Sequence, residues 1–301
     1  MRRIAPSAAL ALLFAAAVWA LASRRHELAD ALSRLTVASV LGSLALATLA
    51  VFAMLMSWAA SVREGAPTLT LRDFNRIYFV GQMGKYLPGS VWPVLTQSML
   101  ARRRGASPGS VATGSLLNLA LTVTVSLLVG AALLPFAPAA AVDQLQWVPF
   151  VLVPMVAVLH PAVLNRLLPL AARLMRREPV NYQASGRTIT ISAAWAVLGS
   201  LLFGAHLYVL VSTLAEGGGR ELVLTTCAYN LAAAAGVIVI IVPAGAGVRE
   251  AVLTAVLAPV LDVSTALAVA LVSRATLVVV DLVLGGLQVP GLRAWSAQEP
   301  A

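Results

Sequence analysis

Two glycine- and proline-rich segments carry the side chains of this sequence that are best suited to bind a negatively charged group. The first, GQMGKYLPGSVWP, runs from Gly81 to Pro93 and contains Lys85, the only lysine of the chain. Glycine lets a ligand approach the backbone closely, and an ammonium beside free backbone N–H groups can hold a phosphate. The alternative is a loop in which Lys85 only adds positive charge. The candidate binding residues here are Lys85, Tyr86, Pro88, Gly89 and Trp92.

The second segment, PAGAGVRE, runs from Pro243 to Glu250. A helix that starts near Gly247 presents unpaired N–H groups and a positive dipole end, which favour an anion. Arg249 can contact a phosphate or carboxylate through two hydrogen bonds, and Glu250 suits the dipole and can pair with Arg249 or Lys85. The alternative is a capped helix end without a ligand. The candidates from this segment are Gly245, Gly247, Arg249 and Glu250.

Two more charges, Arg274 and Asp281, interrupt a long apolar run. Residues seven apart lie on nearly one face of a helix, two turns from each other, which is too far for direct contact. We therefore expect each to pair with another helix, for example Asp281 with Arg249. A charge at the centre of a bilayer costs about 2.5–3.5 kcal/mol on insertion scales. A structural ion pair and a substrate or proton site both remain open.

The composition predicts that these charges lie in a membrane protein. Apolar residues make up 60% of the chain, charged residues 11%, and mean hydropathy is +0.89, whereas soluble domains have about 25% charged residues. Irregular backbone cannot face lipid, so spanning segments must be helices. We expect an all-α, polytopic bundle of about 7–8 spanning helices, forming a single integral membrane domain over residues 1–301. The spans are expected at 4–22, 37–60, 109–134, 146–164, 188–214, 222–242 and 263–287.

Segments 71–101 and 243–260 are too short or too interrupted to span simply, and we expect broken or re-entrant helices there. They also suggest an internal repeat, a plan that transporters use with substrate held between the halves. Four identities in an Ala/Leu/Val-rich chain can also arise by chance. The repeat rests on matching Gly89, Val94, Leu95 and Thr96 with Gly247, Val252, Leu253 and Thr254.

Basic residues predict the orientation, because cytoplasmic loops collect Lys and Arg. Segments 61–108 and 165–187 are rich in Arg, whereas 135–145 has none. We expect both basic loops and the N-terminus to be cytoplasmic, with 4–22 as a retained first helix and 23–36 as an outer loop. The three arginines of that outer loop fit this rule poorly, and the side of the C-terminus stays open. The net charge of +9 then reflects topology, not nucleic-acid binding.

Several chemistries have no support in the sequence. A single cysteine, Cys227, rules out an intramolecular disulfide. The chain has no Walker A loop, HExxH, zinc spacing or G-x-S-x-G motif. We therefore expect no enzyme activity, no cofactor and no metal. Polar residues within predicted spans, such as Asn118 and His206, are expected to bridge helices.

The segments GKYLPGSVWPVLTQSMLARRRG and PAGAGVREAVLTAVL resemble the flippase-like transmembrane domain of the lysylphosphatidylglycerol synthase family. The resemblance implies translocation of a charged lipid or lipid-linked group across a bacterial-type plasma (inner) membrane, with the candidates above binding the lipid headgroup. Full-length synthases add a soluble aminoacyltransferase domain. Since the sequence stops at Ala301, aminoacylation is expected to be missing. Many members carry a further Glu-Arg site where this chain reads Ser115-Leu-Leu-Asn118, which leaves the substrate open.

Three hypotheses follow. The first is a lipid translocase whose partners are membrane lipids with an anionic or phosphate-bearing headgroup. The second is a non-transporting component of cell-envelope assembly, which binds a biosynthetic protein partner or forms a homo-oligomer. The third is a membrane-embedded transferase, which would need a catalytic carboxylate cluster or metal site that the sequence does not display.

Overall fold

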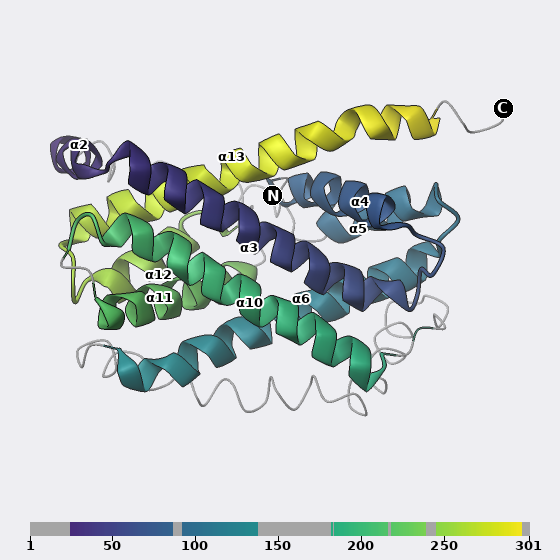
Figure 1. Cartoon of the computed structure of the whole chain (residues 1–301), viewed down its shortest axis with the longest axis horizontal. Helices are drawn as coiled ribbons and strands as arrows, with labels where there is room; N and C mark the ends of the chain where they lie inside the picture. Colours follow the sequence, from purple (N-terminus) through teal and green to yellow (C-terminus); the bar gives the residue numbers. More distant parts are fainter. Residues whose placement is uncertain are drawn as a thin grey trace, which may run out of the picture.

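The computed structural model describes residues 25–86, 92–137, 182, 184–215, 218–238 and 245–296, and within these ranges it contains helices and turns but no strand (Figure 1). The expected all-helical, multi-pass membrane fold is therefore confirmed. Of the described helices, 4 are long and apolar enough to cross a membrane. They are α3 (Val37–Arg63), α6 (Pro108–Leu133, continued by the 3-10 turn η2, Leu134–Phe136), α10 (Gly186–Val211) and α13 (Val263–Ser296).

The count of 7–8 spans stays a prediction, because the expected spans 4–22 and 146–164 lie outside the described residues. The span expected at 222–242 corresponds to α11 (Gly219–Ile238), which is not among those 4 helices. The prediction of a loop over 23–36 was wrong, since α2 (Arg25–Arg34) occupies most of it. Its sequence, RHELADALSR, is rich in helix formers, and Arg34 pairs with Asp30 one turn earlier.

Both segments expected to be broken are interrupted. In the first, α4 (Leu71–Met83) and the 3-10 turn η1 (Gly84–Tyr86) come before α5 (Trp92–Arg102). A Cβ added at Gly84 would lie 3.1 Å from the carbonyl carbon of Trp92, so the chain returns close to the point where it left. Pro88 and Gly89 lie outside the described residues, as does Pro243 in the second segment.

In the second segment, a turn precedes α12 (Val248–Leu257). Gly245 and Gly247 adopt φ angles of +66° and +83°, a backbone region that side chains with a Cβ rarely enter. Glycine is therefore required at both positions to bring the chain into the start of α12.

The outer face of α5 is apolar and its inner face is polar. Trp92, Leu95 and Met99 are exposed, whereas Gln97 is buried. The Gln97 side-chain oxygen accepts a hydrogen bond of 2.9 Å from Ser115 of α6, whose hydroxyl accepts another of 2.9 Å from the Trp58 indole of α3. This inverted pattern suits a helix whose outer face meets hydrocarbon and whose polar groups find partners inside the protein.

The longest helix contact joins α3 and α10, which run antiparallel across the bundle (Figure 1). Ser43 meets His206 near one end, Ser57 meets Ser192 further along, and Glu64 meets Ser185 at the other end. Packing also joins α6 to α11 and α13 to α4. In Figure 1, α4 and α5 lie on one side of the view and α11 and α12 on the other.

Buried polar side chains bridge these helices, as expected for His206 and Asn118. The fully buried His206 ring of α10 lies 2.7 Å from the hydroxyl of Ser43 on α3 and 2.9 Å from that of Ser273 on α13. Asn118 of α6 donates a 2.8 Å hydrogen bond to Ser57 on α3. Each group thereby ties three helices together, because Ser57 also meets Ser192 of α10.

We expect Gly204→Ala to destabilise the contact between α10 and α11. A Cβ at Gly204 would lie 2.7 Å from the Cα of Thr226, so the helices must separate, at a cost of about 1–3 kcal/mol. Thermal unfolding in detergent measures the loss. Gly286→Ala is the control, because a Cβ there meets open space. Equal melting temperatures for the two variants would contradict this view of the contact.

A second prediction concerns Glu64, just beyond the end of α3. Burial alone would raise the pKa of the Glu64 carboxyl, but hydrogen bonds from Ser185 and Thr188 outweigh burial and lower the pKa. A lowered folded-state pKa stabilises the protein above the unfolded-state pKa, about 4.3, and this contribution disappears as the pH falls through the folded-state value.

We therefore expect Glu64→Gln to lower the melting temperature at pH 7. The difference in melting temperature from the unsubstituted protein should become smaller as the pH falls towards 3. Thermal unfolding across this pH range measures it. A difference independent of pH would argue against a role for the carboxylate.

Candidate functional site

Lys85, Tyr86 and Asp281 form the centre of the candidate site. The Lys85 ammonium lies 2.6 Å from Oδ2 of Asp281, and the Tyr86 hydroxyl donates a 2.6 Å hydrogen bond to the same oxygen. The Asp281 side chain is only 3% exposed, whereas that of Lys85 is 34% exposed. The carboxylate is thus buried with two partners, while the Lys85 side chain is partly exposed.

The close contact between α4 and α13 brings these residues together. A Cβ at Gly285 would lie 2.6 Å from the Met83 sulfur and 3.3 Å from the Phe79 carbonyl oxygen. Glycine at this position lets the end of α4 lie directly against α13, one turn beyond Asp281. The turn η1 that follows Met83 then carries Lys85 and Tyr86 to the carboxylate.

A second group of charges lies at the start of α12. Oε2 of Glu250 accepts a 2.6 Å hydrogen bond from the Gly247 backbone N–H and thereby caps the helix. Oε1 of the same carboxylate lies 3.4 Å from Nη1 of Arg274 on α13. Glu250 therefore links the glycine turn to α13, and the negative charge suits the positive end of the helix dipole.

Arg249, the next residue back, points toward α11. The guanidinium carbon lies 5.3 Å from the ring centroid of Tyr229, within the range of a cation–π interaction. A Cβ at Gly236 would lie 2.6 Å from Cγ of Arg249, so the side chain packs directly on the α11 backbone. Tyr229 in turn stacks on Phe203 of α10, with ring centroids 4.6 Å apart.

The two groups form one electrostatic cluster. Arg249 interacts electrostatically with Asp281, and both Arg249 and Arg274 interact with Tyr86. We use the name charge cluster for Lys85, Tyr86, Arg249, Glu250, Arg274 and Asp281. It contains three cations and two carboxylates, and the excess positive charge favours an anion.

Several sequence predictions can now be compared with the geometry. The prediction that Arg274 and Asp281 pair with other helices is confirmed. Their short ion pairs differ from the suggested ones, since Asp281 pairs with Lys85 and Glu250 pairs with Arg274, while Arg249 interacts with both carboxylates electrostatically. Gly245 packs against Gly236, since a Cβ at Gly245 would lie 2.7 Å from the Cα of Gly236. Trp92 begins α5 and is 41% exposed.

Sequence reasoning missed Tyr229 and the role of Gly236. Tyr229 lies seven residues before Gly236, on nearly the same face of α11. An aromatic ring and a glycine on one face provide a flat place for a long cationic side chain. Among the described residues, no group of three or more His, Cys, Asp or Glu side chains has the arrangement of a metal site.

The sequence matches the family described as the lysylphosphatidylglycerol synthase TM region over residues 8–285. No curated protein matches the chain. The matched range contains all six residues of the charge cluster.

We expect the Lys85–Asp281 pair to be energetically coupled. Asp281→Asn leaves the ammonium without its counter-ion, and Lys85→Met removes one partner of a buried carboxylate. The loss of stability in the double variant should be smaller than the sum of the losses in the two single variants, by about 0.5–3 kcal/mol. Thermal unfolding in detergent measures this coupling.

The Arg34–Asp30 pair of α2 is the matched control, because both side chains are well exposed and such pairs contribute at most about 1 kcal/mol. Strict additivity of the Lys85→Met and Asp281→Asn effects would show that the two charges do not depend on each other.

Proposed function

The chain belongs to the family of the lysylphosphatidylglycerol synthase transmembrane region, and from this premise we propose that it is a lipid translocase of the plasma membrane. In this proposal the substrate is a phospholipid or a polyprenyl-phosphate-linked group with a negatively charged headgroup, which moves between the two leaflets. The observation that carries the proposal is the charge cluster, where two interrupted helical segments and α13 meet.

Lys85 is the first contact for the headgroup. Its side chain is partly exposed, and its ammonium is neutralised by Asp281. A phosphate can replace the carboxylate as the partner of Lys85, because Asp281 keeps the Tyr86 hydroxyl and its electrostatic interaction with Arg249. The exchange leaves no buried charge without a partner, which keeps its cost low.

The length of α4 supports a site deep in the membrane. A helix of 13 residues is about 20 Å long, and the hydrocarbon core is about 30 Å thick. If α4 begins at the membrane surface, Lys85 lies past the middle of the core. A headgroup bound there has left one leaflet and has not reached the other, as a translocation intermediate requires.

The contacts between helices support two related halves, α3 to α6 and α10 to α13. In one half-to-half contact, Gly130 of α6 faces Leu231 and the Cys227 carbonyl of α11. In the other, Gly285 of α13 faces Met83 and the Phe79 carbonyl of α4. Because α3 and α10 are antiparallel, the halves have opposite orientations, an arrangement in which transporters move one half against the other.

The basic helix ends support an orientation. The end of α3 and the start of α10 are adjacent through Glu64 and Ser185, and the start of α4 is joined to the end of α5 through Asp73 and Arg104. These ends carry exposed arginines, which favours the cytoplasmic side and a cytoplasmic N-terminus. The exposed arginines are Arg63, Arg72, Arg102, Arg103 and Arg187.

We expect purified protein to accelerate exchange of fluorescent phosphatidylglycerol between the leaflets of vesicles. Arg249→Ala and Lys85→Ala should each slow exchange about tenfold or more, since a hydrogen bond to a charged group contributes about 1.5–3 kcal/mol. Arg187→Ala removes an exposed cation outside the charge cluster and should exchange lipid at the original rate.

Exchange no faster than in empty vesicles would favour the alternative function, a non-transporting component of envelope lipid or glycan assembly. Equal slowing by all three variants would indicate that bulk positive charge, rather than the charge cluster, carries the activity.

A further inference from the structure

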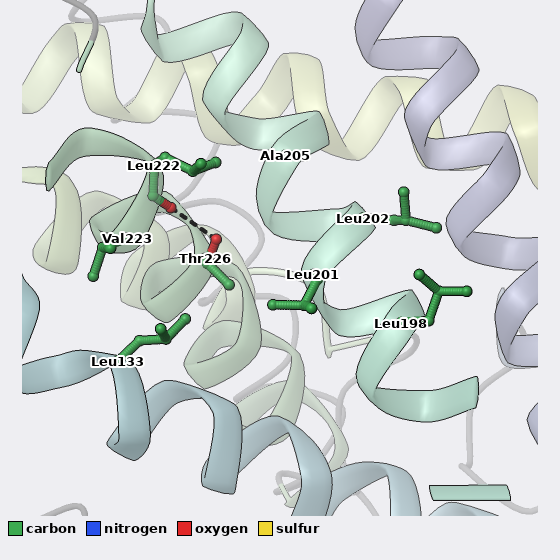
Figure 2. Close-up of a pocket in the computed structure, with 8 residues that line it drawn as sticks. All are labelled: Leu133, Leu198, Leu201, Leu202, Ala205, Leu222, Val223 and Thr226. Carbon is green, nitrogen blue, oxygen red and sulfur yellow. Dashed lines mark hydrogen bonds between the residues drawn. The ribbon is translucent and has the colours of Figure 1, made fainter. Parts of the chain in front are cut away.

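An apolar hollow of about 370 Å³ lies between α6, α10 and α11. Figure 2 shows Leu198, Leu201, Leu202 and Ala205 of α10 on one side, Leu222, Val223 and Thr226 of α11 on another, and Leu133 of α6 below. We call this hollow the leucine groove. Its volume is in the range of small-molecule sites, about 300–1,000 Å³, and it shares no residue with the charge cluster.

The two-half arrangement explains why the groove is open. Two contacts join α3 to α10, one between Ser43 and His206 and the other between Ser57 and Ser192. When the two halves are exchanged, α3 takes the place of α10 and each of these contacts takes the place of the other. Ser57 of α3 therefore corresponds to His206 of α10. Five residues before each lie Phe52 and Leu201. A leucine of the groove therefore corresponds to a phenylalanine in the equivalent contact of α3 with α4 and α13.

The same comparison holds for α4 and α11. Phe79 and Met83 of α4 contact Gly285 in the same way as Cys227 and Leu231 of α11 contact Gly130. Phe79 therefore corresponds to Cys227, and by the same shift along the helix Tyr78 corresponds to Thr226 and Phe74 to Leu222. The rings of the first half fill their contact: Phe52 packs edge-on against Phe79 at 5.3 Å, and Phe79 against Tyr78 at 5.5 Å. The smaller side chains of the second half leave the groove unfilled.

The lining determines what can occupy this space. The Thr226 hydroxyl, the one side-chain polar group among the lining residues, donates a 2.7 Å hydrogen bond to the Leu222 carbonyl (Figure 2). Water needs two to four polar partners and leaves apolar cavities dry, and a headgroup needs polar contacts too. Hydrocarbon needs neither, and it fills space that would otherwise lose van der Waals contacts.

The groove is also accessible to hydrocarbon. Two of its walls, α6 and α10, are long and apolar enough to span a membrane. Leu198, Leu201 and Leu222 are 42%, 44% and 40% exposed, so the groove opens to the surface of the bundle that meets lipid.

We propose that the leucine groove binds one acyl chain of a membrane phospholipid. The groove recognises the hydrocarbon part of a lipid, separately from any headgroup contact at the charge cluster. Binding in the groove does not require that the protein moves lipid between leaflets.

A photoreactive lipid tests this assignment. The full chain is placed in phosphatidylglycerol vesicles that contain phosphatidylglycerol with a diazirine on one acyl chain. After irradiation, labelled peptides are measured by mass spectrometry and normalised to the stretch of α3 from Leu41 to Leu49, two side chains that are exposed and lie outside both the charge cluster and the groove. Leu201→Phe, which introduces the residue found at Phe52, should reduce labelling of α10 and α11 about fivefold or more.

Val197→Phe is the matched control, since Val197 is exposed one turn earlier on α10 and does not line the groove, and it should keep the original labelling. Ala205→Leu, which fills the other end of the groove, gives a second reading if Leu201→Phe folds poorly. Labelling that neither filling variant reduces overturns the proposal, as does a crosslink within the chain showing that residues 138–181 occupy the groove.

Leaflet exchange measured on the same vesicles separates the two proposals. Specific labelling without exchange supports the groove and removes the translocase. If the protein exchanges lipid but the filling variants leave the labelling unchanged, the acyl-chain proposal is overturned and the translocase proposal stands.

Discussion

A polar or charged group inside a bilayer must find its partner within the protein, because hydrocarbon offers none. Asp281 illustrates the rule: the middle of a 34-residue helix carries a carboxylate that an ammonium and a phenol hydroxyl satisfy on one oxygen. The same rule orients α5, whose buried Gln97 reaches a chain of hydrogen bonds through Ser115 to Trp58. The arrangement of the bundle follows largely from such pairings.

Glycine decides how closely the paired elements approach. At Gly285, Gly236 and Gly204 a Cβ would collide with a residue of a neighbouring element, and the first two of these glycines each bring a charged residue to its partner. Because Gly285 has no side chain, α4 packs closely against α13, and this brings Lys85 to Asp281. Gly236 gives Arg249 a place on α11, beside the ring of Tyr229. Small residues thus serve the charge cluster as directly as the charged residues do, since van der Waals contact and interhelical hydrogen bonds hold helices together in lipid.

In the proposed arrangement of two halves, helices α3 to α6 and helices α10 to α13 offer a lipid different environments. The first half contributes Lys85 and Tyr86 and fills the contact between α3 and α4 with aromatic rings. The second half contributes the capped turn of α12 and leaves the leucine groove open. An anionic headgroup and an acyl chain are the two chemically distinct parts of a phospholipid, and the bundle provides a separate environment suited to each.

Hydropathy and residue type determined much of this protein from the sequence alone. Local composition predicts three kinds of feature. These are the long helices α3, α6, α10 and α13, the interruptions near Lys85 and Gly247, and the polar bridges through Asn118 and His206. The sequence also singled out all six residues of the charge cluster, because charges are rare in apolar helices and therefore conspicuous.

Only the tertiary structure decided which of these residues meet. Tyr86 and Asp281 are 195 positions apart, and spacing along the chain says nothing about contacts between helices so distant in sequence. The helix α2, the ring of Tyr229 under Arg249 and the leucine groove were likewise not foreseen. The groove depends on the small volumes of several side chains from three helices, and such a void exists only once those helices have packed.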